Sequence, residues 1–588
     1  MRKTKIICTL GPASEKEEIL REMISAGMDV ARLNFSHGTH ADHKEKMDLV
    51  KKLRAEMKRH IAIMLDTKGP EIRLHKFAGG RVKLEVGQTF ALLPEEIEGD
   101  NTRASITYSQ LYRDVRPGTH ILIDDGLIDM EVERADCSAI LCRVINGGFI
   151  SDRKGINVPG VKLSLPFLSE KDKSDILFGV EQDVDFIAAS FTQCADDILS
   201  IRAELDRAGG QDIKIIAKIE NASGVANIDE IINVSDGIMV ARGDMGVEIP
   251  FEELPVIQKE LIAKSYRAGK QVITATQMLE SMRSNPRPTR AEATDVANAI
   301  YDGTSAIMLS GETAAGSYPV EAVKTMARLA LHTESKIDYK ANITQAKFSQ
   351  IGMGSYFNVT SAISHATCTT AQDLRAAAII TVTKSGQTAR HISKYRPETP
   401  IIGCSCIEKT CRILSLSWGV TPLLIDEKTN SDELFSHAVE MTYANGLVNF
   451  GSLVVITAGI PVGVTGTTNM LKVQIVGDVL VTGTGIVKES VCGPLCVCTD
   501  EDQALSNFKD GDILVIPTTS NRIISILRHA SGIVCERDGA DSHAAIVGQT
   551  LNIPVIVGAP GATKLLKSGT TVTIDGRTGT VYTGNRQP

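Results

Sequence analysis

Short apolar runs rich in Val and Ile recur along the first half of the chain. Each run ends in a polar or glycine-containing loop and is followed by a helical pattern, so a strand–helix unit is repeated. Strands that are apolar throughout are typical of parallel sheets covered on both faces, and eight strand–helix units close into a barrel. The eight runs are Ile6–Leu10, Val30–Phe35, Ile61–Thr67, Phe186–Phe191, Ile213–Ile219, Gly237–Ala241, Val272–Thr276 and Ala306–Leu309. They predict an α/β fold with a (β/α)8 TIM barrel at residues 1–70 and 169–337.

Three barrel helices have a recognisable start or face. Ser14 and Glu17 have capping-box spacing and are predicted to open the first helix, as Ser169 and Asp172 are predicted to open another. A buried face of the second helix is predicted from apolar residues at helical spacing: Met47, Val50, Leu53 and Met57.

Residues 71–168 interrupt the barrel after its third strand. Segments 81–86, 120–123 and 139–145 are short, strand-like and separated by Gly, Pro and Asp-Gly turn signals. We expect an inserted β-barrel lid domain, because an insertion at the carboxyl ends of barrel strands lies over the active site.

Two further parts follow the barrel. Residues 338–472 predict a second α/β domain, with strands at 377–382, 400–404 and 453–457 alternating with helices. Residues 473–588 are rich in Gly and Thr, with many short β runs, and predict an additional small α/β module at the C-terminal end.

The net charge limits which partners we expect, and the cysteine content indicates the cellular compartment. The formal net charge of −8 supplies no basic field for nucleic acid or an anionic membrane, so we expect neither as a partner. No apolar stretch approaches the ~20 residues of a membrane helix. Twelve cysteines in a chain of 588 residues fit reduced thiols in the cytoplasm. Cys404, Cys406 and Cys411 lack the paired spacing of a zinc site and are better explained as core thiols.

Charged and hydroxyl residues gather where the predicted strands end, which is where barrel enzymes place their active sites. Glu220 and Asp244 follow neighbouring strands and could hold one Mg²⁺ while leaving positions open for water and phosphate oxygens. Arg32, Arg73 and Lys218 add positive charge, the arrangement that phosphoryl transfer requires. A single such residue could be a local ion pair, but convergence from several strands favours a site.

These strand ends carry motifs that together resemble the pyruvate kinase family. The motifs are RLNFSHG (32–38), LDTKGPEIR (65–73), AKIEN (217–221), ARGDMGVE (241–248), TATQMLESM (274–282) and MLSGETA (308–314). The resemblance covers residues 1 to about 473. It implies transfer of the phosphoryl group of phosphoenolpyruvate to ADP, giving pyruvate and ATP. It also implies Mg²⁺ (or Mn²⁺) and K⁺ as cofactors, a homotetramer and a phosphorylated small-molecule effector.

The resemblance also implies roles for individual residues. Lys218 would stabilise the phosphoryl group in flight and the enolate, and Glu220 and Asp244 would bind Mg²⁺. The substrate would lie near Arg32, Thr276 and the backbone of Gly243 and Asp244. The implied K⁺ ligands are Asn34, Ser36, Asp66 and Thr67, and the implied nucleotide contacts are Asn34, His37, Arg73 and Lys154.

Two details of that chemistry depend on single residues. Family members with Glu at the position of Glu71 need K⁺, whereas those with Lys carry their own charge. For the proton that reaches C3 of the enolate, Thr276 is the nearest match, but its hydroxyl is a poor acid and a water relay is physically more plausible.

A loop in the second α/β domain resembles the effector loop of the family. It runs through Thr383, Lys384, Ser385, Gly386, Gln387 and Thr388 at the start of a predicted helix. Its backbone N–H groups and hydroxyls could bind a phosphorylated sugar or nucleoside monophosphate. An ordinary N-cap loop is the alternative.

The tail resembles the mobile phosphotransfer domain of phosphoenolpyruvate-using enzymes, with His543 at the phosphorylated position. Asp541 stands two residues before it, where threonine is common, and Asp538 is close in sequence. A phosphoryl group there would be repelled by these carboxylates. We therefore expect His543 to stay unphosphorylated and the module to contribute stability or subunit contacts. A dikinase using phosphohistidine and an inactive metabolite sensor are the alternative functions.

Overall fold

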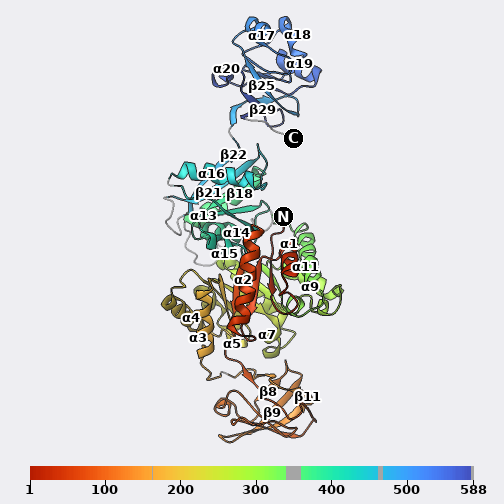
Figure 1. Cartoon of the computed structure of the whole chain (residues 1–588), viewed down its shortest axis with the longest axis vertical. Helices are drawn as coiled ribbons and strands as arrows, with labels where there is room; N and C mark the ends of the chain where they lie inside the picture. Colours follow the sequence, from red (N-terminus) through yellow and green to blue (C-terminus); the bar gives the residue numbers. More distant parts are fainter. Residues whose placement is uncertain (162, 340–358, 429, 461–467, 478, 584–588) are drawn as a thin grey trace. The chain divides into compact units, whose positions relative to one another are not determined.

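The computed structural model describes residues 1–161, 163–339, 359–428, 430–460, 468–477 and 479–583. Figure 1 shows the whole chain, coloured from red at the N-terminus to blue at the C-terminus. The chain divides into two compact units. The first comprises Met1–Cys368, Thr381–Leu424 and Gly459–Asn469, and the second Thr369–Ile380, Ile425–Ala458 and Met470–Pro588. Within the described ranges, none of the helices has the length and apolarity needed to cross a membrane.

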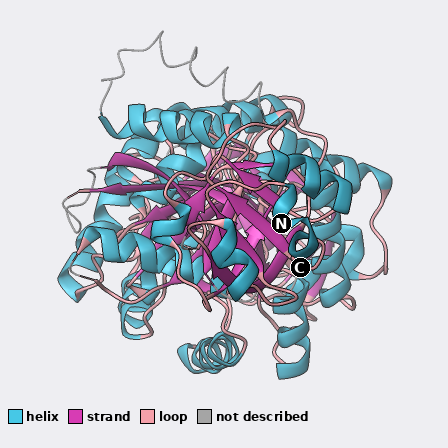
Figure 2. Ribbon diagram, turned by 90° about the horizontal axis from the view of Figure 1, so that it is seen from above, coloured by secondary structure: helices cyan, strands magenta, loops and turns pink. Residues whose placement is uncertain are grey.

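Eight parallel strands close into a barrel in the first unit, in the order β1-β17-β16-β15-β14-β13-β3-β2. Figure 2 colours the strands magenta and the helices cyan. The strands are β1 (Lys5–Thr9), β2 (Val30–Asn34), β3 (Ala62–Asp66), β13 (Phe186–Ala189), β14 (Lys214–Ile219), β15 (Gly237–Ala241), β16 (Gln271–Ala275) and β17 (Ala306–Leu309). Each lies within two residues of its predicted run, so the predicted barrel is confirmed.

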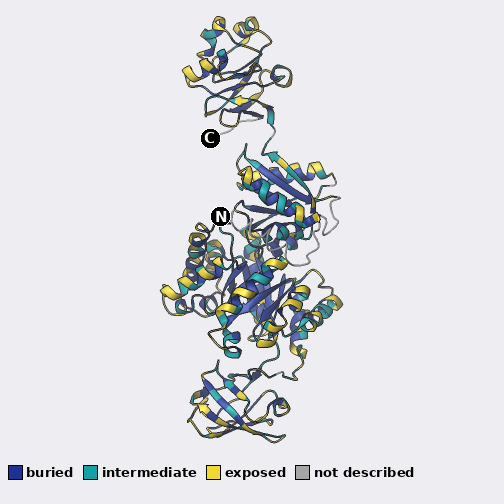
Figure 3. Cartoon of the chain, turned by 180° about the vertical axis from the view of Figure 1, so that it is seen from behind, coloured by how far each residue is buried: buried dark blue, intermediate teal, exposed yellow. Residues whose placement is uncertain are grey.

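The interior of the barrel is filled by side chains from its own strands and from a later segment. Ile7, Phe186 and Met239 are fully buried there, and Ile413 and Leu416 join the same apolar cluster. Figure 3 shows the barrel strands as buried. Ile413 belongs to helix α15 (Glu408–Leu414), so the core of the barrel includes side chains more than a hundred residues beyond its last strand.

One of the two capping-box predictions is wrong. Helix α1 (Glu17–Ala26) begins after Lys16, which makes no side-chain cap. Ser14 lies outside the helix, and its Oγ instead accepts a 3.0 Å hydrogen bond from the backbone N–H of Gly11. Helix α3 (Glu170–Glu181) does have the predicted box, with Ser169 and Asp172 bonded reciprocally.

The predicted face of the second helix is confirmed. Helix α2 (His40–Glu56) buries Met47, Val50 and Leu53, and Met57 packs partly buried against the same core.

The insertion is a β structure with its own apolar cluster. Its main sheet has the order β4-β12-β8-β9-β10-β6-β7, and β5 pairs with β11. The strands are β4 (Ile72–Arg73), β5 (Arg81–Leu84), β6 (Thr89–Leu93), β7 (Arg103–Ser105), β8 (His120–Ile123), β9 (Ile128–Ala135), β10 (Ile140–Asn146), β11 (Gly148–Ser151) and β12 (Gly155–Asn157). The three predicted segments coincide with β5, β8 and β10.

The first unit also contains helix α14 (Gln387–Lys394) and the parallel pair β19 (Ile401–Ser405) and β20 (Val420–Leu424). The remaining predicted strands of this region are β18 (Ala378–Val382) and β21 (Leu453–Gly459).

The second unit contains an eight-stranded sheet with the order β23-β30-β29-β25-β26-β27-β28-β24. These strands are β23 (Val479–Thr482), β24 (Thr484–Gly485), β25 (Ser490–Val497), β26 (Ile513–Ile516), β27 (Gly532–Cys535), β28 (Val555–Val557), β29 (Thr571–Asp575) and β30 (Thr580–Thr583). Helix α19 (His543–Leu551) packs against β27 and β28 and begins at the histidine singled out in the sequence.

Candidate active site

Lys218 lies at the centre of a buried polar cluster inside the carboxyl end of the barrel. From β14, its ammonium donates to Ser190 Oγ at 2.8 Å and to Asp66 Oδ1 at 3.1 Å. It also lies 2.9 Å from Glu220 Oε1. Burial disfavours the ammonium, but Asp66 and Glu220 together outweigh it and raise the pKa of Lys218. The cluster therefore holds a permanent positive charge beside two carboxylates.

Asp66 links Lys218 to Arg32. The guanidinium Nε of Arg32 donates to Asp66 Oδ2 at 2.5 Å, and its Nη1 donates to Thr9 Oγ1 at 2.9 Å. Burial alone would raise the pKa of Asp66, but the two cations hold it below its ordinary value. One carboxylate thus orients two positive charges toward the same end of the barrel.

Glu220 and Asp244 supply the negative side of the site. Glu220 Oε2 accepts a 2.6 Å hydrogen bond from the backbone of Phe191, whose φ of 55° is unusual for a bulky residue. Burial raises the pKa of Glu220 to about 7, and Asp244 and Asp66 add to the rise while Lys218 opposes it. Closely placed carboxylates of this kind fit a divalent cation, which would relieve their repulsion with the oxygen ligands that Mg²⁺ prefers.

Thr276 follows β16 in a strained conformation, with φ 66°. Its hydroxyl donates to the carbonyl of Ala275 at 2.6 Å and accepts from the N–H of Gly243 at 2.8 Å. Gly243 lies in helix α7 (Arg242–Glu248), so the structure brings together two of the predicted substrate contacts.

A cavity between the inserted β structure and the barrel is lined by two of the four predicted nucleotide contacts. Arg73 and Lys154 line it together with Asp244. The guanidinium of Arg73 makes two hydrogen bonds to Glu71, at 2.7 and 2.9 Å, and Lys154 Nζ lies 2.7 Å from Asp124 Oδ1. Both cations are half-exposed, so phosphate oxygens entering this cavity could exchange for these carboxylates.

The implied K⁺ ligands occupy the ends of two paired strands. Asn34 and Asp66 are register partners on β2 and β3. Asn34 Oδ1 accepts from the backbone of Ser36 at 3.1 Å, and Thr67 Oγ1 lies buried next to Ser190. His37 is exposed on the loop after β2. The set consists of hard oxygen atoms, which suit an alkali cation.

Two residues with clear structural roles were not assigned any by sequence reasoning. Ser190 bridges Lys218, Asp66 and the carbonyl of Thr67. Arg242 stands in a quoted motif without a role, yet its guanidinium is buried and bonds the backbone that carries Thr276. Ser190 could have been identified from the sequence, because it places a hydroxyl at the end of the fourth apolar run.

The predicted effector loop precedes and enters α14. Thr383 Oγ1 accepts from the N–H of Gly386 at 3.0 Å, and Gly386 has φ 77°. The carbonyl of Lys384 accepts from Thr410, and Thr388 bonds Thr468 at 2.9 Å. These contacts hold the loop in one shape, and they are compatible with either an anion site or an ordinary N-cap turn.

His543 has partners at both ring nitrogens. Nδ1 lies 2.9 Å from Thr519 Oγ1, and Nε2 lies 3.0 Å from Asn521 Oδ1. Asp538 and Asp541 are exposed on the preceding loop. Because the Asn521 oxygen can only accept, Nε2–H donates to it and Nδ1 accepts from the Thr519 hydroxyl.

Comparisons with known proteins agree along the whole chain. Family models match as "Pyruvate kinase, barrel domain" at residues 1–323, "Pyruvate kinase, alpha/beta domain" at 361–474 and "PEP-utilising enzyme, mobile domain" at 508–579. A pyruvate kinase of Sporosarcina psychrophila is 49% identical over 587 residues, covering 100% of this chain and 99% of that protein. One of Geobacillus stearothermophilus is 50% identical, covering 99% of each. The crystal structure of a pyruvate kinase from Cryptosporidium parvum matches with a TM-score of 0.76 at 40% identity, covering 81% of this chain and 96% of that one.

Proposed function

Since this chain belongs to the pyruvate kinase family and transfers the phosphoryl group of phosphoenolpyruvate to ADP, giving pyruvate and ATP, we propose that the Lys218 cluster carries out that transfer. The observation that carries the assignment is the buried ammonium of Lys218, held by Ser190, Asp66 and Glu220 at the carboxyl end of the barrel. A preorganised charge of this kind stabilises a transferring phosphoryl group because it needs no reorientation during the reaction.

The substrate lies between this cluster and the loop after β16. Arg32 and Lys218 face the phosphoryl group, and Thr276 with the backbone of Gly243 and Asp244 faces the carboxylate. As the bond from phosphorus to the enol oxygen breaks, a bond from phosphorus to the terminal oxygen of ADP forms. The enolate left behind is stabilised by Lys218 and takes a proton at C3. The hydroxyl of Thr276 is engaged by Ala275 and Gly243, which supports delivery of that proton through water.

Glu220 and Asp244 would hold Mg²⁺ or Mn²⁺, and Asn34, Ser36, Asp66 and Thr67 would hold K⁺. Cations held by these residues would supply positive charge to neutralise the phosphoryl oxygens. Within the chain itself, Glu220 orients Lys218, and Asp66 orients Arg32.

The nucleotide phosphates lie in the cavity lined by Arg73 and Lys154, and Asn34 and His37 are the other two proposed nucleotide contacts. Arg73 and Lys154 pair with carboxylates in this structure. When the nucleotide binds, its phosphate oxygens would replace these carboxylates as partners of the two cations. The lid position of the insertion would then help exclude water from the transfer.

Regulation and assembly follow the family pattern. We propose a homotetramer, with a phosphorylated small molecule bound at residues 383–388 as effector. A cytoplasmic location is supported by the twelve cysteines, none of which forms a disulfide in the part of the chain that the structure describes.

A coupled assay that follows pyruvate formation from phosphoenolpyruvate and ADP tests the assignment. We expect turnover that needs ADP and a divalent cation and that is lost in Lys218→Met. Turnover of the Lys218→Met protein at the wild-type rate would refute the assignment of the cluster.

A further inference from the structure

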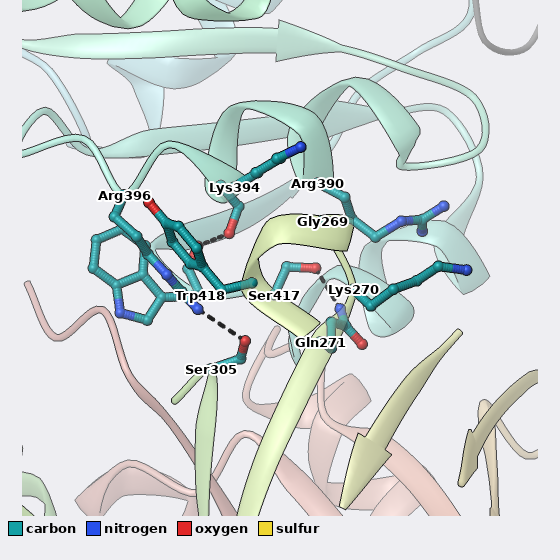
Figure 4. A pocket seen from close by; sticks show the side chains of 11 residues that line it. Gly269, Lys270, Gln271, Ser305, Arg390, Lys394, Arg396, Ser417 and Trp418 are labelled. Atoms are coloured by element: carbon teal, nitrogen blue, oxygen red, sulfur yellow. Dashed lines mark hydrogen bonds between the residues drawn. The ribbon is translucent and has the colours of Figure 1, made fainter. Parts of the chain in front are cut away.

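A second cationic cavity lies at the opposite end of the barrel from the Lys218 cluster. It is formed where β16 begins, at Lys270 and Gln271, and where α14 and the turn after it pass by (Figure 4). The empty space between these residues is about 290 Å³, and this figure includes open solvent. All of its lining residues belong to the first compact unit.

Four cationic side chains line this cavity: Lys270, Arg390, Lys394 and Arg396. Among the described residues that line it, none is a carboxylate. Asp236 is the acid whose charge acts on Lys270 and Arg390, and the charge of Glu334 acts on Arg396. Asp236 already pairs with Arg202 and Lys214. The cavity thus has a large excess of positive charge.

Arg396 is the most buried of the four, at 7% exposure. Its Nη2 donates to the Gly303 carbonyl at 2.9 Å and to Ser305 Oγ at 3.0 Å, while Nε and Nη1 have no hydrogen-bond partner in the described structure. Its guanidinium lies 4.6 Å from the ring centre of Trp418 and 5.8 Å from that of Tyr266. Two buried N–H groups are therefore left for a ligand.

The other three cations make few hydrogen bonds to the described part of the protein. Lys270 Nζ donates to the carbonyl of Ser235 at 2.6 Å, and Arg390 makes a long 3.4 Å bond to the carbonyl of Ser385. Burial lowers the pKa of Lys270 and of Lys394, and it lowers the pKa of Arg396 to about 10. An anion in the cavity would compensate the unfavourable burial of these cations.

We propose that this cavity binds a phosphate dianion, either inorganic phosphate or the phosphate group of a small phosphoester. Guanidinium and ammonium groups are the side chains that recognise phosphate oxygens, and the charge excess favours a dianion over chloride. None of the four cations belongs to the predicted effector loop at residues 383–388, although Arg390 bonds the carbonyl of Ser385 within it.

The position of the cavity connects two functional regions. Helix α14 begins in the predicted effector loop and carries Arg390 and Lys394 into the cavity. Strand β16 begins at the cavity and ends immediately before Thr276. A ligand here contacts both elements at once.

The chain contains one tryptophan, Trp418, and it lines this cavity, so its fluorescence reports occupancy directly. We would titrate the full-length protein with inorganic phosphate and, separately, with glycerol 2-phosphate, keeping ionic strength constant with NaCl. We expect a saturable fluorescence change with at least one of them. Lys394→Gln should weaken it about tenfold or more, which is the loss of one charge-assisted hydrogen bond. Lys270→Gln, which leaves α14 intact, should do the same.

Lys384→Gln tests the effector loop as the alternative site, because it removes a cation from that loop and from none of the residues that line the cavity. The same titration should give the wild-type affinity in this variant. Circular dichroism establishes that each variant is folded. The proposal is overturned if neither phosphate compound gives a saturable change, if NaCl alone reproduces it, or if Lys384→Gln abolishes it while Lys394→Gln and Lys270→Gln do not.

Discussion

The guanidinium of Arg242 holds the backbone that carries Thr276. Its Nη2 donates to the Thr276 carbonyl at 2.6 Å and its Nε to the carbonyl of Ala275 at 3.2 Å. Thr276 is β-branched and has a φ of 66°, a conformation that persists only where the surroundings impose it. Arg242 therefore positions the loop that carries Thr276, and it does so through the backbone of that loop.

We expect Arg242→Met to lower kcat/KM for phosphoenolpyruvate by about 10²-fold, because small displacements at a reacting centre have effects of this size. Arg242→Lys should recover part of the loss. Steady-state kinetics on protein whose melting temperature has been measured separates this role from a general loss of folding. If the folded fraction of Arg242→Met has wild-type kcat and KM, Arg242 supports only stability.

Lys218→Met should lower kcat by about 10²–10³-fold while phosphoenolpyruvate still binds, because a charge aimed at the transition state acts mainly on kcat. Direct binding measurements alongside the coupled assay check both parts. Lys173→Met is the control, since Lys173 forms only an exposed pair with Glu170. A Lys218→Met enzyme with more than about a hundredth of wild-type kcat would contradict the role given to this residue.

Activity should require K⁺, as Glu71 occupies the position that distinguishes dependent from independent members of the family. In Glu71→Lys we expect the requirement to weaken, whereas Glu71→Gln, which adds no cation, should retain it. Because Glu71 also pairs with Arg73, both variants should change the KM for ADP similarly. Rates in KCl and NaCl at equal ionic strength decide the matter, and full wild-type activity in sodium alone would rule the idea out.

The loop at residues 383–388 should respond to a phosphorylated effector. We expect ribose 5-phosphate, AMP or fructose 1,6-bisphosphate to lower the half-saturating concentration of phosphoenolpyruvate, and Thr383→Ala to reduce that response because Thr383 bonds Gly386 within the loop. Lys472→Gln, at a half-buried residue of β22 (Thr468–Ile475), should respond as the wild type does. Absence of any response to all three compounds would leave the N-cap interpretation.

His543 should remain unphosphorylated during turnover, because both ring nitrogens have partners and Asp538 and Asp541 lie close in sequence. His543→Ala should keep the wild-type rate. Incubation with labelled phosphoenolpyruvate should give no acid-labile label on the protein. Stoichiometric label on His543, or an inactive but folded variant, would restore a phosphotransfer role.

Features that depend on neighbours in the sequence were predictable, and features that depend on neighbours in space were not. The eight strands were found because buried parallel strands are apolar throughout. Ser190 was missed because its partner Asp66 lies more than a hundred residues away in the chain. The capping box predicted at Ser14 does not form, because the helix does not begin next to Ser14. The Ser14 hydroxyl instead accepts a hydrogen bond from the backbone of Gly11 in a turn.

The side chains of Ile413 and Leu416 complete the interior of the barrel, and Arg412 beside them pairs with the buried Asp185 at 2.8 Å. The catalytic barrel consequently cannot be excised by cutting the chain after its last helix. Such a fragment would leave a cavity in the apolar interior of the barrel. It would also leave the buried carboxylate of Asp185 without the guanidinium of Arg412. Any attempt to transplant this barrel, or to fuse it to another regulatory part, has to carry the segment around residues 412–416 with it.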